Sequence, residues 1–138
     1  MGTLITIPVT KFRLVPKFVE ENGEQIKKYE TEKTVGELEL SVITSFSSHL
    51  KWEENFQKDK GNMNLALFTT QVSDWLKDES LALANFTDLL RWVYCFIDSD
   101  KLPNFSAFVD MLDMDNFKDL FDQMKLVLNE VGRSATKN

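Results

Sequence analysis

The feature that most constrains the fold is an apolar stripe near the C-terminus of the chain. Six apolar residues recur there at intervals of three or four, which places their side chains on one face of an α-helix. They are Phe117, Leu120, Phe121, Met124, Leu128 and Val131. A helix with one apolar face buries that face, so these side chains are predicted to point into a core. Gly132 is predicted to end the helix, and residues 133–138 to form a disordered tail.

Similar spacing predicts further helices earlier in the chain. The stretch Thr34–Glu37 has the spacing of a capping box, which predicts a helix that starts at Val35 and runs towards Trp52 or Phe56. Apolar residues predict two more helices around residues 65–76 and 86–97, with a polar loop over 57–62 before them. A short helix is expected over about 105–112, with Asp115 as the cap of the last one.

The first third of the chain alternates in the manner of β-strands. Residues 3–7 are rich in β-branched side chains, and apolar and basic residues alternate from Phe12 to Phe18. The Asn22-Gly23 pair is typical of a tight hairpin turn, and a second strand is predicted to end near Lys33. Two strands are marginally stable alone. The hairpin is therefore expected to pack on the helices or on a neighbouring subunit.

These elements predict an α+β fold, with an N-terminal β-hairpin packed on four or five helices. A length of 138 residues fits one domain that can bury a core. We expect this domain to cover residues 1–132, with the hairpin region at 1–33 and the helical region at 34–132.

Charge and composition exclude several classes of partner. The net charge is −6, and residues 98–130 hold eight acidic side chains against three lysines. Such a surface repels a phosphate backbone, so no nucleic-acid binding is expected, and the partner should be neutral or basic. No apolar run reaches the roughly 20 residues of a membrane helix, so no membrane partner is expected either. Cys95 is the single cysteine, which indicates a reducing intracellular setting.

No motif in the chain predicts catalysis, a cofactor or a metal site. Asp98, Asp100 and Asn104 have the alternate spacing of calcium ligands, but Pro103 and Val109 stand where an EF-hand loop needs Gly and Glu. Cys95 lies among apolar residues and is predicted to be a small buried side chain. His49 is predicted to be solvated or to cap a helix. A Cys-His nucleophile pair stays open as an alternative, although nothing in the sequence orients it.

Aromatic residues in the helical half are candidates for a partner-binding surface. They are Trp75, Trp92, Phe96, Phe105 and Phe108. Aromatic residues are enriched at the centres of interfaces, but they are also common in protein cores. The sequence does not separate a core stripe from a binding face.

The chain resembles the tail assembly chaperones of long-tailed (siphovirus-type) phages of Gram-positive bacteria. The resemblance rests on the order of the elements and on three stretches in the last third, 88–98, 104–117 and the closing helix. Residues 10–14 and 29–34 also resemble the hairpin of the family. Met111 is a departure, because many relatives carry Gly at that place.

The resemblance implies a non-catalytic homo-oligomer in the host cytoplasm that is absent from the mature virion. It implies two partners, namely the tape-measure protein, which is bound and kept soluble, and the tail-tube protein, which is recruited around it. The family often makes a longer form by ribosomal frameshifting, and Thr136-Lys137-Asn138 is compatible with a slippery codon run. An edge strand of the hairpin is expected to pair between subunits. Two alternatives stay open, a small adaptor or regulator that binds another helix, and an enzyme of unrecognised type.

Overall fold

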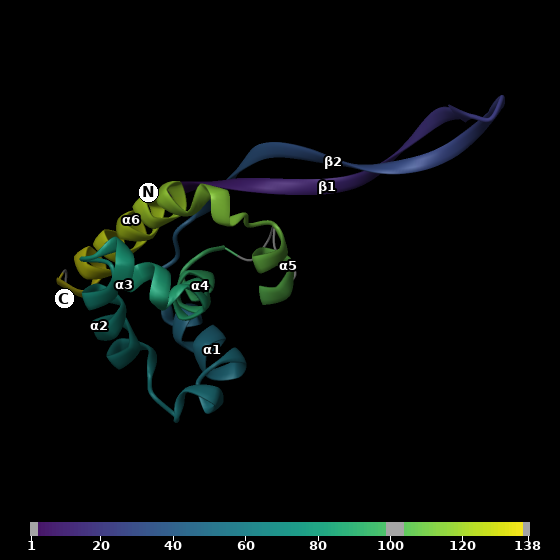
Figure 1. Ribbon diagram of the computed structural model, residues 1–138. Coiled ribbons are helices and arrows are strands. Elements are labelled where there is room, and N and C mark those ends of the chain that lie inside the picture. Colours follow the sequence, from purple (N-terminus) through teal and green to yellow (C-terminus); the bar gives the residue numbers. More distant parts are fainter. Residues whose placement is uncertain (1–2, 99–103, 137–138) are drawn as a thin grey trace.

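A computed structural model describes residues 3–98 and 104–136 of the chain. Its fold is α+β, as the sequence predicts, with a long two-stranded hairpin that extends away from a group of helices (Figure 1). None of the helices in the described ranges is long and apolar enough to cross a membrane.

The hairpin consists of two antiparallel strands of 18 residues each, β1 (Leu4–Glu21) and β2 (Glu24–Ser41). They pair without a break, from Leu4 opposite Ser41 to Glu21 opposite Glu24. The turn between them holds Asn22 at φ 54° and Gly23 at φ 80°. Two positive φ values in a two-residue loop match the right-handed twist of the strands. The predicted turn is confirmed.

The predicted end of the second strand near Lys33 and the predicted helix start at Val35 are both wrong. Residues 35–41 continue β2 and pair with residues 4–10 of β1. Leu38 and Leu40 alternate with Glu37 and Glu39, and this period of two matches a strand with one buried face. Burial of that face outweighs the few tenths to about 2 kcal/mol that a helix cap contributes. The hairpin region therefore extends beyond residue 33.

Six α-helices lie in the described ranges, against the four or five that were predicted. They are α1 (Phe46–Asn55), α2 (Leu65–Trp75), α3 (Glu79–Ala84), α4 (Phe86–Cys95), α5 (Phe105–Asp110) and α6 (Phe117–Thr136). The sequence analysis missed α3, whose six residues are too few to show a helical period. The predicted loop over 57–62 contains a 3-10 turn, η1 (Lys58–Lys60), followed by Gly61 in the left-handed region at φ 67°.

Two predictions about α6 need correction. The helix passes Gly132 and continues to Thr136, so Gly132 does not end it and residues 133–136 are not a disordered tail. Gly132 lies within the helix and is not among the glycines with the positive φ that a glycine stop adopts. Asp115 was predicted to cap this helix, but the capping residue in this region is Asp113. Its side chain accepts from the Asp115 N–H and caps the 3-10 turn η3 (Met114–Asn116), which precedes α6.

The apolar stripe of α6 faces the core, as predicted. Leu120, Phe121 and Met124 are buried, while Phe117, Leu128 and Val131 are half-buried and pack against the core. Val127, which was not named as part of the stripe, is also fully buried. The stripe on α6 is therefore wider than the six residues taken from the sequence.

The centre of the helical body is aromatic. Trp52 of α1 and Trp92 of α4 are both 0% exposed. The Trp52 ring lies 4.5 Å from that of Phe68, and its indole N–H donates to the Met63 carbonyl at 2.7 Å. The Trp92 N–H donates to the Thr69 hydroxyl at 2.9 Å. Both indoles thus satisfy their single polar group inside the core, which removes the cost of burying it.

The first part of the hairpin belongs to this core. Ile5, Ile7, Val9 and Leu40 are buried on one face of it. The helix α6 lies along the outer edge of β1 (Figure 1), where the Gln123 side chain accepts from the Thr6 N–H at 2.9 Å. Two further contacts fix the same region: the Thr10 N–H donates to the Met111 carbonyl at 2.8 Å, and the Thr3 hydroxyl donates to Glu130 at 2.7 Å.

Candidate functional site

Beyond the pair formed by Thr10 and Val35, the hairpin projects away from the helices (Figure 1). We call this projecting part, residues 11–34, the arm. Successive side chains of a strand point to opposite faces, and residues directly opposite each other share a face. The arm therefore has two distinguishable faces, which the register of the two strands defines.

One face of the arm carries large exposed apolar side chains, and Lys27, directly opposite Phe18 and over the Tyr29 ring, shares this face. Leu14, Pro16 and Phe18 lie on it from β1, and Tyr29, which is directly opposite Pro16, lies on it from β2. The exposed fractions are 68% for Leu14, 67% for Phe18 and 59% for Tyr29. Val35 continues this face at the base of the arm and is 60% exposed. We call Leu14, Pro16, Phe18, Tyr29 and Val35 the apolar arm face.

The opposite face of the arm is dominated by charge. Lys17 forms an ion pair with Glu30 at 2.7 Å, and Lys28 forms one with Glu21 at 2.8 Å. The neighbouring Glu30 side chain raises the pKa of Lys17, first through their hydrogen bond and then through charge attraction. These exposed pairs contribute little to stability, but they keep this face soluble. The contrast between the faces indicates that the apolar one is a contact surface.

The outer edges of the two strands also differ. The N–H groups of Thr6 and Thr10 point away from β2, because both donate to the helical body. Pro8 and Pro16 are an even number of residues from Thr6 and Thr10, so their backbone nitrogens also point away from β2. The missing N–H groups therefore cost the hairpin no hydrogen bond, and they remove two donors from the outer edge of β1. The outer edge of β1 is thereby covered at its base and interrupted in the arm, which are two ways to prevent strand pairing.

The outer edge of β2 has no such protection in the arm. This strand contains no proline. Near its base, the Ser41 carbonyl accepts from the Asp98 N–H at 2.9 Å, and Val42 forms an isolated bridge with Ile97. Within the described residues, no backbone hydrogen bond to another segment is found on the outward side of residues 25–35. A row of outward N–H and C=O groups is therefore available for pairing with another strand.

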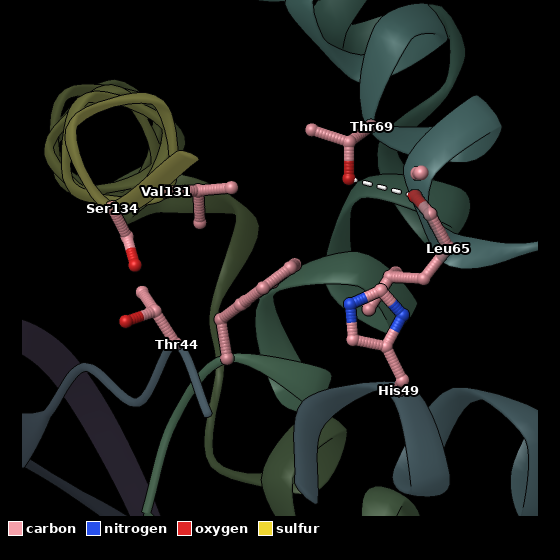
Figure 2. A pocket seen from close by; sticks show the side chains of 8 residues that line it. Thr44, His49, Leu65, Thr69, Val131 and Ser134 are labelled. Carbon is pink, nitrogen blue, oxygen red and sulfur yellow. Dashed lines mark hydrogen bonds between the residues drawn. The ribbon is translucent and has the colours of Figure 1, made fainter. Parts of the chain in front are cut away.

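A second candidate is a pocket of about 360 Å³ between α1, α2 and α6 (Figure 2). Its lining is Thr44, His49, Leu65, Ala66, Thr69, Phe96, Val131 and Ser134. His49 is the only titratable side chain in this lining. The Thr69 hydroxyl, which could otherwise face a ligand, donates to the Leu65 carbonyl at 2.8 Å and accepts from Trp92. The other polar side chains of the lining are Thr44, His49 and Ser134, and the rest of the pocket wall is apolar.

The residues that the sequence suggested for partner binding lie in or against the core. Trp92, Phe96 and Phe108 are 0%, 4% and 1% exposed, so they lie in the core and not at the surface of this structure. Trp75 and Phe105 are half-buried and pack against the core. Trp75 meets Phe68 edge to face at 5.7 Å, and Phe105 meets Phe56 at 5.1 Å. These aromatic residues are used to fill the space between short helices.

The residues of the apolar arm face were missed as a site, although their alternation was recognised. A signal was available in the sequence: the apolar residues continue on both strands up to the turn, while a two-stranded ribbon has no second layer to cover them. What could not be deduced was that β2 extends eight residues beyond its predicted end near Lys33, to Ser41. That length is what carries Leu14 and Phe18 beyond the reach of the helices.

The Cys-His alternative can be judged from the state of the thiol. Cys95 is buried, as predicted, and this burial raises its pKa to about 12. The thiolate is the nucleophilic form of cysteine, so this group is a poor nucleophile at neutral pH. The Nζ of Lys51 lowers the pKa of Cys95 slightly, but it is committed to the carbonyls of Tyr94 and Ile97 at 3.1 and 2.7 Å.

The predicted absence of a calcium site concerns residues that are only partly described. Asp100 and Pro103 lie outside the described residues. In the parts that are described, no group of three or more His, Cys, Asp or Glu side chains is arranged to hold a metal ion. The cluster of Lys60, Asp88 and Arg91 is an ion-pair network, with both cations on one carboxylate at 3.0 and 2.7 Å.

Comparisons of the chain with protein-family models, with curated proteins and with solved structures found no match.

Proposed function

We propose that the chain is a phage tail assembly chaperone, a non-catalytic protein that binds an apolar helical partner and keeps it soluble until assembly. The partner is the tape-measure protein, and the assembly step is the recruitment of tail-tube subunits around it. The observation that carries this proposal is the apolar arm face, a row of large exposed side chains held away from the helical body. The resemblance of the sequence to the family supplies the identity of the partner.

The arm face suits an amphipathic helix. A helix with apolar residues at i, i+3, i+4 and i+7 presents a stripe, and a β-sheet with one apolar face is a surface on which such stripes pack. Full burial of a Leu or Phe side chain contributes about 1.5–3 kcal/mol. Leu14 and Phe18 retain about two thirds of their exposed surface, so most of that free energy is still available for binding.

The charge distribution supports the same role. The arm holds six basic and five acidic residues, a net charge of +1. The rest of the chain therefore carries a net charge of −7, which gives −6 for the whole chain. An acidic body on each bound copy makes coated complexes repel one another, which opposes their aggregation. The ion-paired face of the arm adds no apolar surface of comparable exposure, since Val19 and Ile26 are 39% and 37% exposed.

Co-expression tests the proposal directly. The tape-measure protein encoded beside this chain is expected to remain soluble and to co-purify with it, and to precipitate when expressed alone. The double variant Leu14→Ser with Phe18→Ser removes apolar surface and should abolish rescue. The matched control is Val19→Ser with Ile26→Ser, which changes an opposed pair on the other face and should retain rescue.

If the tape-measure protein is equally insoluble with and without the chain, the chaperone assignment is wrong. If it stays soluble with both double variants alike, the chaperone role stands and the arm face is not its site. Binding of a different amphipathic helix, lost only with the Leu14 and Phe18 substitutions, would instead support the adaptor alternative.

A further inference from the structure

We infer that a second copy of the chain pairs with the outer edge of β2 in the arm, antiparallel and centred on Tyr29, so that two hairpins form one four-stranded sheet. The inference rests on the proposed function in one respect, because the paired arms enlarge the surface that is proposed to bind the helical partner. It requires no helical partner, however, so it can fail or succeed separately. It names the edge, the register and the symmetry of the contact.

The choice of β2 follows from what covers each edge. On β1, the outward N–H groups of Thr6 and Thr10 are already bonded, and Pro8 and Pro16 have none to offer. On β2, the outward positions of the arm are residues 25, 27, 29, 31 and 33, and none is proline. A strand added here makes hydrogen bonds at every outward position, whereas a strand added to β1 meets a gap at Pro16.

The register follows from the charges along β2. When a strand pairs with its own copy around a two-fold axis, residues at equal distances from the axis lie opposite each other. Centring the axis on residue 27, 28 or 31 places two glutamates opposite each other, and centring on 32 places Glu32 opposite itself. Centring on 30 places Lys27 opposite Lys33, and centring on 33 places Lys33 opposite itself. Like charges in these positions are destabilising.

The axis at Tyr29 is the only one between residues 27 and 33 that avoids such pairs. It places Lys28 opposite the second copy's Glu30, and this favourable pair occurs twice because of the symmetry. Lys27 lies opposite Thr31, Gln25 opposite Lys33, and the Tyr29 residues face each other. The five outward pairs exchange about ten backbone hydrogen bonds. The edge of β2 is therefore complementary to itself in one register.

The geometry of the arm permits this pairing. The turn of one copy ends level with Val35 and Gly36 of the other, at the Thr10–Val35 pair that marks the base of the arm. Among the described residues, the first backbone hydrogen bond between the body and the β2 edge is farther along, at Ser41. The two bodies lie at opposite ends of the joined sheet, so neither blocks the other. A two-fold contact uses the same patch on both copies and closes at two.

The pairing also places the two apolar arm faces side by side. The two-fold axis is perpendicular to the sheet, so Leu14, Phe18 and Tyr29 of both copies lie on one side of it. A two-stranded ribbon is marginally stable, whereas a sheet of four strands supports a packed layer on one face. The dimer therefore doubles the surface that the proposed function assigns to the helical partner.

Single cysteines test the register, because the native Cys95 is buried and does not compete. Opposed residues in a hydrogen-bonded antiparallel pair have Cα atoms about 5.5 Å apart, which is within the range of a disulfide. Tyr29→Cys is expected to give covalent dimers under mild oxidation. Lys27→Cys and Thr31→Cys are each expected to form no covalent dimer alone, because the two copies of each residue lie about 13 Å apart in the dimer. A mixture of these two should give covalent heterodimers.

Proline variants test which edge is used, with the oligomeric state of the full chain measured by sedimentation over a wide range of concentrations. Thr31→Pro interrupts the β2 edge and should weaken the dimer at least about tenfold. Leu14→Pro is the matched control, because Leu14 lies directly opposite Thr31 and faces the β1 edge. It should leave the dimer intact. Circular dichroism checks that each proline variant is folded. If a proline variant does not fold, the cysteine variants test the interface instead.

A monomeric chain at all concentrations, without covalent dimers of Tyr29→Cys, overturns the inference. So does a dimer that survives Thr31→Pro but is lost in Leu14→Pro, since the β1 edge would then be the interface. Disulfides formed by Thr31→Cys alone, and not by Tyr29→Cys, would show that the register is wrong. Each of these results leaves the rescue of the tape-measure protein to be judged by its own experiment.

Discussion

The helical body and the arm contain similar kinds of side chain but bury them to opposite extents. Trp52 and Trp92 in the body are fully buried, whereas Leu14 and Phe18 in the arm remain about two-thirds exposed. The difference lies in the number of layers. The helices of the body surround a common core, and the base of the hairpin joins that core, but among the described residues no second layer covers the arm. An apolar side chain thus stabilises the fold in one region and is left for binding in the other.

The largest effect should come from Trp52→Ala in the body. The substitution removes a side chain with 0% exposure, its contact with Phe68 and its hydrogen bond to Met63. We expect a loss of about 3–5 kcal/mol in the free energy of unfolding, measured with denaturant. Phe18→Ala in the arm is the comparison and should cost less than about 0.5 kcal/mol. Similar losses for the two variants would contradict the division into body and arm.

Alkaline pH should destabilise the body through Cys95. The unfolded thiol ionises near pH 9, while the folded thiol, with its pKa raised to about 12 by burial, keeps its proton. The folded state then binds more protons, so stability falls by about 1.4 kcal/mol for each pH unit between 9 and 12. The lowered pKa of Lys51, caused by its burial, acts in the opposite direction below pH 10.5 and reduces the slope.

Chemical unfolding between pH 8 and 10.5 measures this dependence, and Cys95→Ala isolates the contribution of the thiol. The variant should be less stable at pH 8, because it loses buried volume, but its stability should decline less steeply with pH. If stability falls equally steeply with pH in the two proteins, burial does not keep the Cys95 thiol protonated.

Two glycine substitutions should have opposite signs in the two regions. Gly23→Ala places a side chain at φ 80° in the turn of the arm, and should cost about 1 kcal/mol. Gly132→Ala meets nothing within 4 Å on α6, and should stabilise that helix by about 0.5–1 kcal/mol. Hydrogen exchange reads out both effects locally. Faster exchange confined to the arm amides in Gly23→Ala would support independent opening of the arm, whereas a uniform change along the chain would not.

The smallest effect on stability should come from Leu14→Ser with Phe18→Ser, which changes only exposed side chains. We expect the free energy of unfolding of the free chain, measured by thermal melting, to change by less than about 0.5 kcal/mol. The same variant is the one expected to lose binding of the helical partner. A large loss of stability would mean that these side chains are covered in the free protein, and the comparison between body and arm would then fail.

Local signals in the sequence were sufficient for several elements. Asn22-Gly23 predicted the turn because positive φ values are a property of those two residues and need no tertiary contact. The spacing along α6 predicted which side chains face the core, since a helix fixes that relation by itself. The burial of Cys95 followed in the same way from its apolar neighbours.

The candidate site was less accessible to sequence analysis, because it depends on what is absent around the arm. The aromatic residues chosen for partner binding, such as Trp92 and Phe108, were needed to fill the body, and nothing in their local pattern distinguishes that use from an interface. Phe18 and Tyr29 alternate with polar residues as Ile5 and Ile7 do, but they lie on the opposite face of the hairpin, and only Ile5 and Ile7 are covered.

The sequence by itself determined the turn, the helical periods, the acidic excess outside the arm and the self-complementary charges of β2, since each is a relation between neighbouring or paired positions. Only the tertiary structure decided that residues 35–41 form a strand, against a local capping box. It also decided that α6 continues through Gly132 and that the hairpin extends beyond the helices that cover its base. For residues 35–41 the physical reason is that burial of one strand face against the helical body outweighs a local capping preference of about 1 kcal/mol.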